Sequence, residues 1–495
     1  MKKSLRSGSM EWFIEEDRLS SHSRSVVTVT HTGSPKLKTV QVLVIGAGSA
    51  GRYAAKQAAR LGKSVLLVEQ GPFGGLCILK GCMPSKALLR SAHIFSMIRH
   101  EIRDLGLGHD GGFSFDLPGI IRMKNRMIGE MAEDAKASVE GFPGLTLLSE
   151  SASFLSADSA RIGNEPIHFE RAVIATGSVP KIPAIPGLSM DWVMTSDDIL
   201  EMETLPESVL VLGAGPVGLE LGQFLSMLGV AVIVVEISAH WNADLDPRIQ
   251  DGYIGSLRKR GLSIQLGFRS EHFSEKEGRP VLQGTSEGEP LELTADKVLL
   301  ATGRRPDIDG LNLGQAGVTL SHHQAIHVDE YLRTSNPRIF AAGDVTGHLP
   351  VLNLATYHGE IAGFNAASAT PKKALDRPVP TAIFTEPEFA RVGLSEGSAR
   401  ALHRPVLTGY LHFSDLGKAI VNRQTDGALK IVADRSTREI LGAEMFGPGA
   451  SDLIHLITVA MGLSATIDQY QRILHIHPTM AEIVKYVIED MTDAL

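Results

Sequence analysis

Two stretches of the sequence repeat the same order of strand, glycine-rich turn and helix, and this repeat constrains the fold more than any other feature. Residues 40–69 read VQVLVIGAGSAGRYAAKQAARLGKSVLLVE, and residues 208–236 read SVLVLGAGPVGLELGQFLSMLGVAVIVVE. Each begins as an apolar strand, continues through glycines into a helix, and ends in a second apolar strand. We therefore predict an α/β fold with two Rossmann-like βαβ units.

Each unit carries a G-x-G-x-x-G motif between its first strand and its helix. These glycines permit a tight turn, close approach of a pyrophosphate and contact of the helix with the strand. The helix start then offers free N–H groups and the positive end of its dipole to phosphates. Both units end in a carboxylate placed to accept hydrogen bonds from ribose hydroxyls; an ordinary α/β domain with glycines that serve packing alone is the alternative. The predicted cofactor-binding residues are Gly46, Gly48, Gly51 and Glu69 in the first unit and Gly213, Gly215, Gly218 and Glu236 in the second.

Two units imply two dinucleotides. Glu236 would repel a 2′-phosphate, and no arginine follows it within residues 237–240, so the second unit favours NAD over NADP. The first unit, which precedes the cysteine segment, suits FAD.

Three further segments resemble strand ends beside these sites. Two of them end in Ala-Thr-Gly, and we expect a ligand close to Gly177 and Gly303. In the third, RIFAAGDVTG, Asp344 follows a glycine. Its carboxylate either accepts a hydrogen bond from a flavin ribityl hydroxyl or caps a turn.

The only two cysteines, Cys77 and Cys82, lie in the segment GGLCILKGCMPSK at residues 74–86. A metal site needs three or four ligands, which this segment does not supply. A structural disulfide that closes so short a loop would add only roughly 2 kcal/mol to a chain of this size. On a regular helix the two Cα atoms would lie roughly 8–9 Å apart, too far for a disulfide, so we expect a distortion at Gly81. Strained, short-loop disulfides are easily reduced, and a redox role fits best.

The segment that follows the cysteines, MPSKALLRSAHIF, is typical of a helix. Cys82 would then lie near a helix start, where the dipole lowers the pKa of a thiol. Lys86 adds a positive charge one turn further on.

Composition excludes several classes of function. The net charge of −8 opposes nonspecific binding to nucleic acid, and no stretch approaches the ~20 apolar residues of a membrane span. The first 38 residues lack the apolar core of a secretory signal, and we expect a Ser/Thr-rich, disordered extension. Two cysteines in 495 residues indicate a reducing cytoplasm.

The sequence resembles the class I pyridine nucleotide-disulfide oxidoreductases, and within them the dihydrolipoamide dehydrogenases. The resemblance rests on the cysteine segment, the two dinucleotide units and the C-terminal HIHPTMAE at residues 475–482. The resemblance covers roughly residues 39–490. It implies that Cys82 contacts the flavin and that Cys77 attacks the substrate disulfide. It also implies that Lys86 lies at the flavin, paired with Glu220.

In HIHPTMAE, the resemblance identifies His477 as the acid–base catalyst and Glu482 as the carboxylate that orients it. Thiol–disulfide exchange needs a proton acceptor that titrates near neutrality, which a histidine supplies. We expect His475 to be structural. Because His477 is far from Cys82 in the sequence, the family arrangement implies a homodimer in which one subunit completes the site of the other.

The resemblance implies FAD and NAD as cofactors and sets the expected domains. They are an N-terminal extension at 1–38, an FAD-binding domain at 39–184, an NAD-binding domain at 185–315, a return to the FAD and central region at 316–374, and an α+β dimerisation domain at 375–495. The implied reaction converts dihydrolipoamide and NAD⁺ to lipoamide and NADH, with a lipoyl-bearing acyltransferase of a 2-oxo acid dehydrogenase complex as a candidate partner.

The redox loop departs from the usual pattern. Ile78, Leu79 and Lys80 stand where dihydrolipoamide dehydrogenases usually have Leu-Asn-Val. The Lys80 cation could lower a thiol pKa or change the acceptor, so another disulfide, a quinone or a dye-like acceptor is the alternative substrate. Mercuric reductases rely on a C-terminal cysteine pair, and no cysteine follows Cys82, so we do not expect reduction of mercuric ion. A flavin-bound redox sensor or assembly subunit is the alternative from another class of function.

Overall fold

The structure is a computed structural model that describes residues 39–100, 102–108 and 113–493. The N-terminal extension expected at residues 1–38 lies outside the described residues. Within these ranges, none of the helices combines the length and the apolar character needed to cross a bilayer.

The first predicted βαβ unit is confirmed and forms the centre of a seven-stranded sheet. Strand β1 (Thr39–Ile45) leads into α1 (Ser49–Arg60) and then into β2 (Val65–Val68), which pairs with β1 in parallel. The sheet order is β3-β2-β1-β6-β5-β4, and β17 pairs with β6. The remaining strands are β3 (Leu145–Leu148), β4 (Ala152–Ser156), β5 (Ser159–Ile162), β6 (Glu165–Ile174) and β17 (Ile339–Ala341).

The second unit is also confirmed, in a separate parallel sheet of order β11-β10-β9-β15-β8. Here β9 (Ser208–Leu212), α6 (Pro216–Met227) and β10 (Ala231–Val235) repeat the arrangement of the first unit. The other strands are β8 (Val193–Met194), β11 (Ser263–Gln265) and β15 (Lys297–Leu300). An antiparallel sheet follows, made of β12 (Phe268–Lys276), β13 (Arg279–Ser286) and β14 (Glu289–Thr294).

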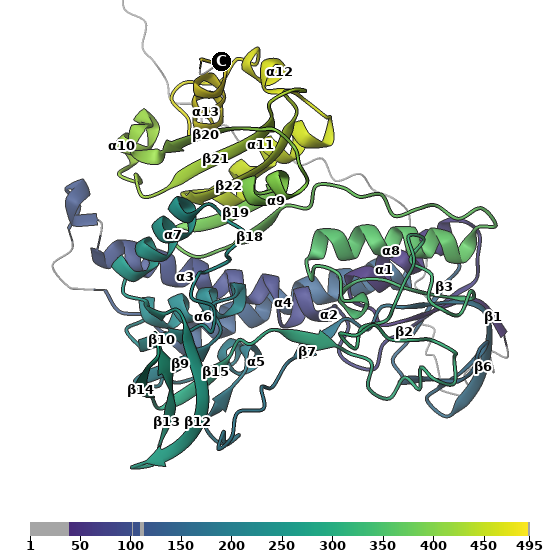
Figure 1. Cartoon of the computed structure of the whole chain (residues 1–495). Helices are drawn as coiled ribbons and strands as arrows, with labels where there is room; N and C mark the ends of the chain where they lie inside the picture. Colours follow the sequence, from purple (N-terminus) through teal and green to yellow (C-terminus); the bar gives the residue numbers. More distant parts are fainter. Residues whose placement is uncertain (1–38, 101, 109–112, 494–495) are drawn as a thin grey trace, which may run out of the picture. The chain divides into compact units, whose positions relative to one another are not determined.

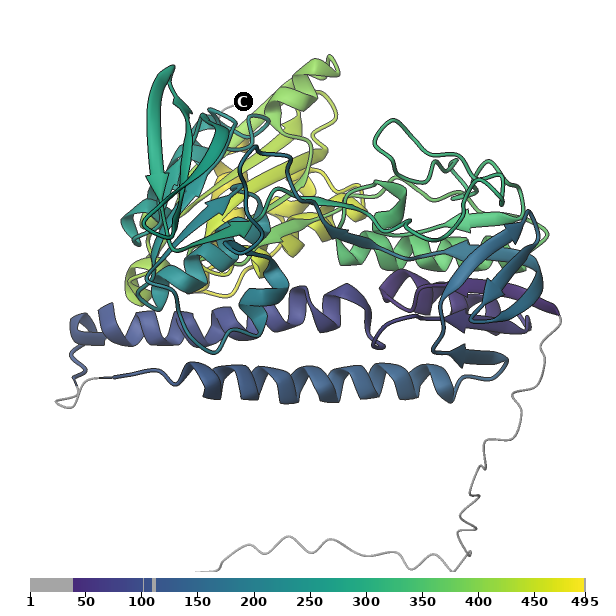
Figure 2. The same cartoon turned by 90° about the horizontal axis from the view of Figure 1, so that it is seen from below.

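The cysteine segment lies in two helices that connect the first sheet to the second. After the short α2 (Gly75–Leu79), the long helix α3 (Cys82–His100) packs against α6 and runs beside α4 (Leu117–Glu140) (Figure 2). On the first sheet, α8 (Leu352–Ala367) packs tightly on α1 (Figure 1). The other helices in this part of the chain are η1 (Ile102–Leu105), α5 (Ser196–Leu200), α7 (Pro247–Lys259) and η2 (Asp344–Thr346).

The C-terminal part is an antiparallel five-stranded sheet with helices, as expected for an α+β fold. Its order is β18-β19-β22-β21-β20. The strands are β18 (Thr381–Ile383), β19 (Glu388–Gly393), β20 (Val406–His412), β21 (Ala428–Asp434) and β22 (Ile440–Gly447). The helices are α9 (Glu396–Ala401), η3 (Phe413–Asp415), α10 (Gly417–Asn422), α11 (Ala450–Gly462), α12 (Ile467–Gln471) and α13 (Glu482–Asp493).

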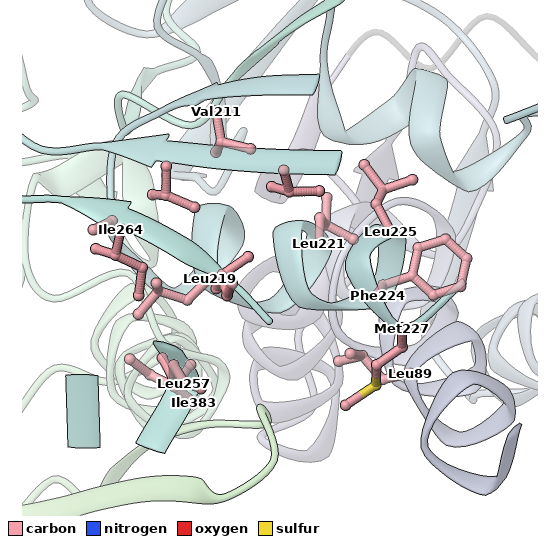
Figure 3. Packing of buried hydrophobic residues seen from close by; sticks show 14 of the residues in the cluster. Leu89, Val211, Leu219, Leu221, Phe224, Leu225, Met227, Leu257, Ile264 and Ile383 are labelled. Atoms are coloured by element: carbon pink, nitrogen blue, oxygen red, sulfur yellow. The ribbon is translucent and has the colours of Figure 1, made fainter. Parts of the chain in front are cut away.

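One apolar core joins the parts of the chain that surround the cysteines. It contains Leu89 of α3, Val211 of β9, Phe224 of α6 and Leu257 of α7. Ile383 from the C-terminal sheet enters the same cluster (Figure 3). The position of α3 is therefore set by packing against the second sheet and the C-terminal sheet as well as by its own sequence.

A buried lysine joins the second βαβ region to the C-terminal sheet. Lys430 of β21 is 2% exposed, and its Nζ lies 2.6 Å from Asp246 Oδ2 and 2.6 Å from Glu396 Oε2. Asp246 caps α7 through the N–H of Arg248 and donates its own N–H to Glu444 of β22. The Lys430 ammonium therefore binds the N-cap carboxylate of α7 and a carboxylate of α9, where the second βαβ region meets the C-terminal sheet.

We expect Lys430→Met to lower the free energy of unfolding by about 3 kcal/mol, because it removes the buried partner of Asp246, which is 8% exposed and keeps only the more exposed Arg248 as a counter-ion. Urea unfolding followed by far-ultraviolet circular dichroism measures the loss. The control is Lys485→Met, which removes a partly exposed pair with Glu489 and should cost no more than about 1 kcal/mol. Equal losses in the two variants would contradict the role assigned to Lys430.

Candidate functional site

The helix break between Cys77 and Cys82 brings the two thiols together. Helix α2 ends at Leu79 and α3 begins at Cys82, so the expected distortion is present. A Cβ at Gly81 would lie 2.9 Å from the Leu76 carbonyl oxygen, so the turn is too tight for a side chain at this position. The two free cysteines hydrogen-bond to each other through their side chains.

A close approach of two glycines places α2 on the first glycine-rich turn. Gly75 has φ +69°, and a Cβ there would overlap the Cα of Gly48. Only glycine accepts both this backbone conformation and this contact. Cys77, two residues further on, therefore lies beside the start of α1.

The proton shared by the thiol pair belongs mainly to Cys77. The hydrogen bond from Cys77 is the largest cause that lowers the pKa of Cys82 to about 7, and the Lys86 cation acts in the same direction. The same hydrogen bond, together with burial, raises the pKa of Cys77. Near neutral pH the pair loses its first proton from Cys82, at the N-terminus of α3, and Cys77 stays protonated.

Lys86 and Glu220, predicted to pair, form an ion pair with Nζ 2.7 Å from Oε2. Glu220, on α6, is only 4% exposed. Its other oxygen accepts the N–H of Phe384 at 3.0 Å, and the Lys86 ammonium lies 4.6 Å from the centroid of the Phe384 ring. The contacts of Phe384 tie the C-terminal part of the chain to this pair, a link that the sequence did not indicate.

The structure does not support the hypothesis that Lys80 acts on the thiol pKa. The Lys80 ammonium lies 2.7 Å from Asp197 in the first turn of α5. The cation that lowers the pKa of Cys82 is Lys86. Because Lys80 pairs with Asp197, which is far away in the sequence, Lys86 is the lysine that acts on the thiol of Cys82.

Both glycine-rich turns have the same local structure. Glu69 accepts the N–H of Ala47 at 2.8 Å, and Glu236 accepts the N–H of Ala214 at 3.0 Å. No side chain of the described residues caps α1 or α6, which start after Gly48 and Gly215. These helix starts therefore keep N–H groups for a phosphate, and both carboxylates lie at the turns, as a dinucleotide requires.

A cavity of about 810 Å³ opens at the second turn. It extends from Glu236 past Gly303 to Asp344. Lining residues include Gly213, Gly215, Glu236, Ile237, Ser270, Gly303, Arg304, Asp344 and His348. The predicted NAD-binding residues Gly213, Gly215 and Glu236 therefore share one cavity with Gly303 and Asp344, whereas Gly218 is buried where α6 packs on its own turn.

Asp344 and Arg304 meet through Ser178. The Ser178 hydroxyl donates to Asp344 Oδ2 at 2.7 Å, and Arg304 Nε donates to the same hydroxyl at 2.8 Å. Burial lowers the pKa of Arg304, and Asp344 offsets this effect. Sequence reasoning missed Ser178 and Arg304, although each directly follows one of the two glycines, Gly177 and Gly303.

The threonine of each Ala-Thr-Gly segment donates a hydrogen bond to a backbone carbonyl close to the other segment. Thr176 Oγ1 donates to the Asp307 carbonyl at 2.6 Å, and Thr302 Oγ1 donates to the Lys181 carbonyl at 2.9 Å. Between them, β7 (Ser178–Pro180) and β16 (Arg304–Pro306) pair antiparallel. This connection holds the two dinucleotide units against each other at the cavity.

His477 and Glu482 form a second, separate cluster. His477 Nδ1 lies 3.1 Å from Glu482 Oε1, and the imidazole side chain is 74% exposed. The Thr479 N–H bonds to Glu482 and, with His477, lowers the pKa of its carboxyl group. Within the described chain, no hydrogen bond or ion pair joins His477 to either cysteine. His475 instead contacts the carbonyl of Ile473.

We expect Lys86→Met to raise the pKa of Cys82 above 7, because it removes the cation that stabilises the thiolate. The rate of alkylation of the reduced protein by iodoacetamide, followed against pH, measures this pKa. Lys80→Met is the matched control and should leave the pKa near 7, since Asp197 holds Lys80. A shift in the control that equals the shift in Lys86→Met would contradict the assignment.

Comparisons with known proteins agree with this geometry. The chain is 31% identical over 474 residues to a mercuric reductase of Bacillus cereus, covering 96% of this chain and 74% of that protein. It is 32% identical to dihydrolipoyl dehydrogenase 3 of Haloarcula marismortui, covering 90% and 95% of the two chains. The solved HOCl-induced flavoprotein disulfide reductase RclA from Escherichia coli superposes with a TM-score of 0.80 at 27% identity, covering 91% and 99%.

Two family models match in sequence order. Residues 40–369 match the pyridine nucleotide-disulphide oxidoreductases, and residues 379–488 match the dimerisation domain of the same proteins. This membership supports FAD as a cofactor and a nicotinamide nucleotide as its redox partner. The chain belongs to the pyridine nucleotide-disulphide oxidoreductase family.

Proposed function

We propose that this protein transfers two electrons between NAD(H) and an external dithiol or disulfide, through FAD and the Cys77–Cys82 pair. The most specific form of the proposal is the reaction of dihydrolipoamide and NAD⁺ to lipoamide and NADH. The observation that carries it is the pair of cysteines on the two sides of the break between α2 and α3, which lies beside the Lys86–Glu220 ion pair and the first glycine-rich turn.

The residues present fit FAD. The uncapped start of α1 at Gly46, Gly48 and Gly51 would hold the pyrophosphate, and Glu69 would bind a ribose. Gly177 leaves open space around its Cα, and Asp344 would accept a hydrogen bond from the ribityl chain. Bound FAD would supply the electron transfer between hydride and thiols, while the protein sets orientation and thiol acidity.

The second unit favours NAD over NADP. Glu236 lines the cavity at the end of β10, where it would bind two ribose hydroxyls and repel a 2′-phosphate. The next residue, Ile237, is an exposed apolar side chain at a position where NADP binding would call for a cation near the 2′-phosphate. Gly213, Gly215 and Gly218 form the turn that would hold the pyrophosphate.

The thiols then exchange with the substrate in two balanced steps. Cys77 gives up its proton and attacks one sulfur of the acceptor disulfide, whose sulfur–sulfur bond breaks, and the other sulfur leaves as a thiolate and takes a proton. Cys82 attacks the Cys77 sulfur of the mixed disulfide, which releases the second substrate thiol and restores the Cys77–Cys82 disulfide. His477 would take and return the protons, since Glu482 holds its Nδ1 and leaves Nε2 free for the substrate.

This role for His477 requires a second copy of the chain. The imidazole is exposed, and neighbouring apolar side chains such as Leu474 and Ile476 are 97% and 79% exposed. A homodimer would cover them and bring His477 of one copy to the thiols of the other, which the dimerisation-domain match supports.

Another acceptor is the second candidate. Relatives at similar identity include both mercuric reductases and dihydrolipoyl dehydrogenases. A different disulfide, a quinone or a dye-like acceptor could therefore use the same machinery. The dihydrolipoamide form of the proposal includes a lipoyl-bearing acyltransferase as partner, which would supply the dihydrolipoyl substrate. It also includes a cytoplasmic location, where the cysteines would stay reduced.

We expect the FAD-loaded dimer to oxidise NADH in the presence of lipoamide, and Cys77→Ser to abolish this turnover. The variant should keep the long-wavelength absorption band that a thiolate gives beside a bound flavin, because Cys82 remains. Steady-state assays and absorption spectra measure both properties. NADH oxidation that does not depend on lipoamide in the parent protein would favour the second candidate.

We expect His477→Gln to slow lipoamide reduction by about 10²–10⁴-fold, the usual contribution of a positioned acid–base group. Reduction of the flavin by NADH, followed by rapid mixing, should keep its rate. His475→Gln is the matched control and should stay close to the parent in both assays. If both histidine variants lose the same activity, the acid–base assignment is wrong.

A further inference from the structure

Trp241 contacts the second glycine-rich turn from a buried position. It lies in the loop that follows β10, and only 6% of its surface is exposed. Its indole N–H donates to the carbonyl oxygen of Ala214 at 2.8 Å. Ala214 stands between the first two glycines of the G-x-G-x-x-G motif. A side chain to which the sequence gave no role therefore reaches the centre of the turn.

This contact fixes the second of the two backbone polar groups of Ala214. The Ala214 N–H bonds to Glu236 Oε2 at 3.0 Å, and the carbonyl accepts from Trp241. In a trans peptide the carbonyl and the N–H that follows it point in opposite directions, so Trp241 also sets the direction of the Gly215 N–H. Gly215 lines the cavity, and its N–H has no acceptor among the described residues. Placed just before α6, this N–H is one that the motif offers to a pyrophosphate.

The two glycine-rich turns differ at this point. In the first turn the Ala47 N–H has the matching bond to a carboxylate, but no side chain of the described residues donates to the Ala47 carbonyl. Gly75 instead packs against Gly48 there. In the second turn a Cβ at Gly215 would meet nothing within 4 Å, so no neighbouring backbone supports this glycine. The hydrogen bond from Trp241 is the support that the second turn has in its place.

Three aromatic rings hold the indole in the orientation that this bond requires. The Trp241 ring lies 4.8 Å from that of Tyr253 on α7 and 5.1 Å from that of Phe389 on β19, measured between centroids. The Tyr253 and Phe389 rings are 5.3 Å apart, and all three residues belong to the apolar core around α3 and α6. The Tyr253 hydroxyl bonds to that of Thr385 at 2.7 Å. The C-terminal sheet therefore supports the nucleotide-binding turn through Trp241.

We propose that Trp241 is a positioning residue for the nicotinamide nucleotide, which holds the peptide between Ala214 and Gly215 in the orientation that binds the pyrophosphate. This inference deepens the proposed function and rests on its use of NAD(H). A turn that is already held in its binding conformation loses less freedom when the nucleotide binds. The contact acts through the backbone of the turn, so it strengthens binding and takes no part in hydride transfer.

Calorimetric titration of the oxidised, FAD-loaded protein with NAD⁺ tests the proposal without turnover. Trp241→Phe keeps an aromatic ring in the cluster and removes the N–H donor. We expect it to raise the Kd for NAD⁺ about threefold to tenfold, the range expected for one hydrogen bond between neutral groups. ADP-ribose, which keeps the pyrophosphate and lacks the nicotinamide, should lose affinity by the same factor. A loss confined to NAD⁺ would contradict a role at the pyrophosphate.

Further variants separate the hydrogen bond from packing. Incorporation of 3-benzothienylalanine at position 241 keeps the shape of the indole and lacks its N–H, so it should match Trp241→Phe. Tyr253→Phe removes the hydroxyl of a neighbouring ring, and Trp192→Phe makes the same change at the other tryptophan of the described residues. Both controls should keep the parent Kd. The proposal is overturned if both variants at position 241 bind NAD⁺ like the parent, or if Tyr253→Phe weakens binding as much as they do.

Rapid mixing with NADH separates nucleotide binding from hydride transfer. In Trp241→Phe, the NADH concentration that gives half the maximal rate of flavin reduction should rise by the same factor as the Kd, with the maximal rate close to that of the parent. A lower maximal rate at an unchanged half-saturating concentration would refute the positioning role. If the parent does not bind NAD⁺, the proposed function loses its nucleotide. Binding by the parent that does not depend on Trp241 rejects this inference alone.

Discussion

The hydrogen bond between the Cys77 and Cys82 thiols is the interaction on which the site depends. It exists because α2 ends at Leu79 and α3 begins at Cys82, with a tight turn at Gly81 between them. A continuous helix would hold the residues too far apart for the sulfurs to meet. The bond makes the two thiols unequal, since it lowers the pKa of Cys82 and raises that of Cys77. One thiol is thereby suited to remain a thiolate and the other to exchange with a substrate.

Contacts from distant parts of the chain support this pair. Glu220 reaches Lys86 from the second βαβ unit, and Phe384 from the C-terminal part contacts both members of that ion pair. The buried Lys430 joins the C-terminal sheet to α7 through Asp246. Each of these links spans a predicted domain boundary, so the acidity of Cys82 depends on how the domains pack as well as on the redox segment.

Internal symmetry explains the shape of the cofactor region. The two βαβ units have the same carboxylate-to-turn hydrogen bond, and the two Ala-Thr-Gly segments exchange hydrogen bonds through Thr176 and Thr302. Departures from symmetry give each unit its own role. The first turn contacts Gly75 and so carries the thiols, whereas the second opens into the cavity that reaches Asp344.

The sequence by itself determined the two βαβ units, the distortion at Gly81, the helix after Cys82 and the α+β character of the C-terminal part, because strand and helix periodicity and glycine turns are local properties. It also named Lys86 and Glu220, through the family resemblance. Only the tertiary structure decided that Lys80 pairs with Asp197 and that Ser178 joins Arg304 to Asp344. Ion pairs and burial depend on which distant residues meet, and the packing of separate elements sets those distances.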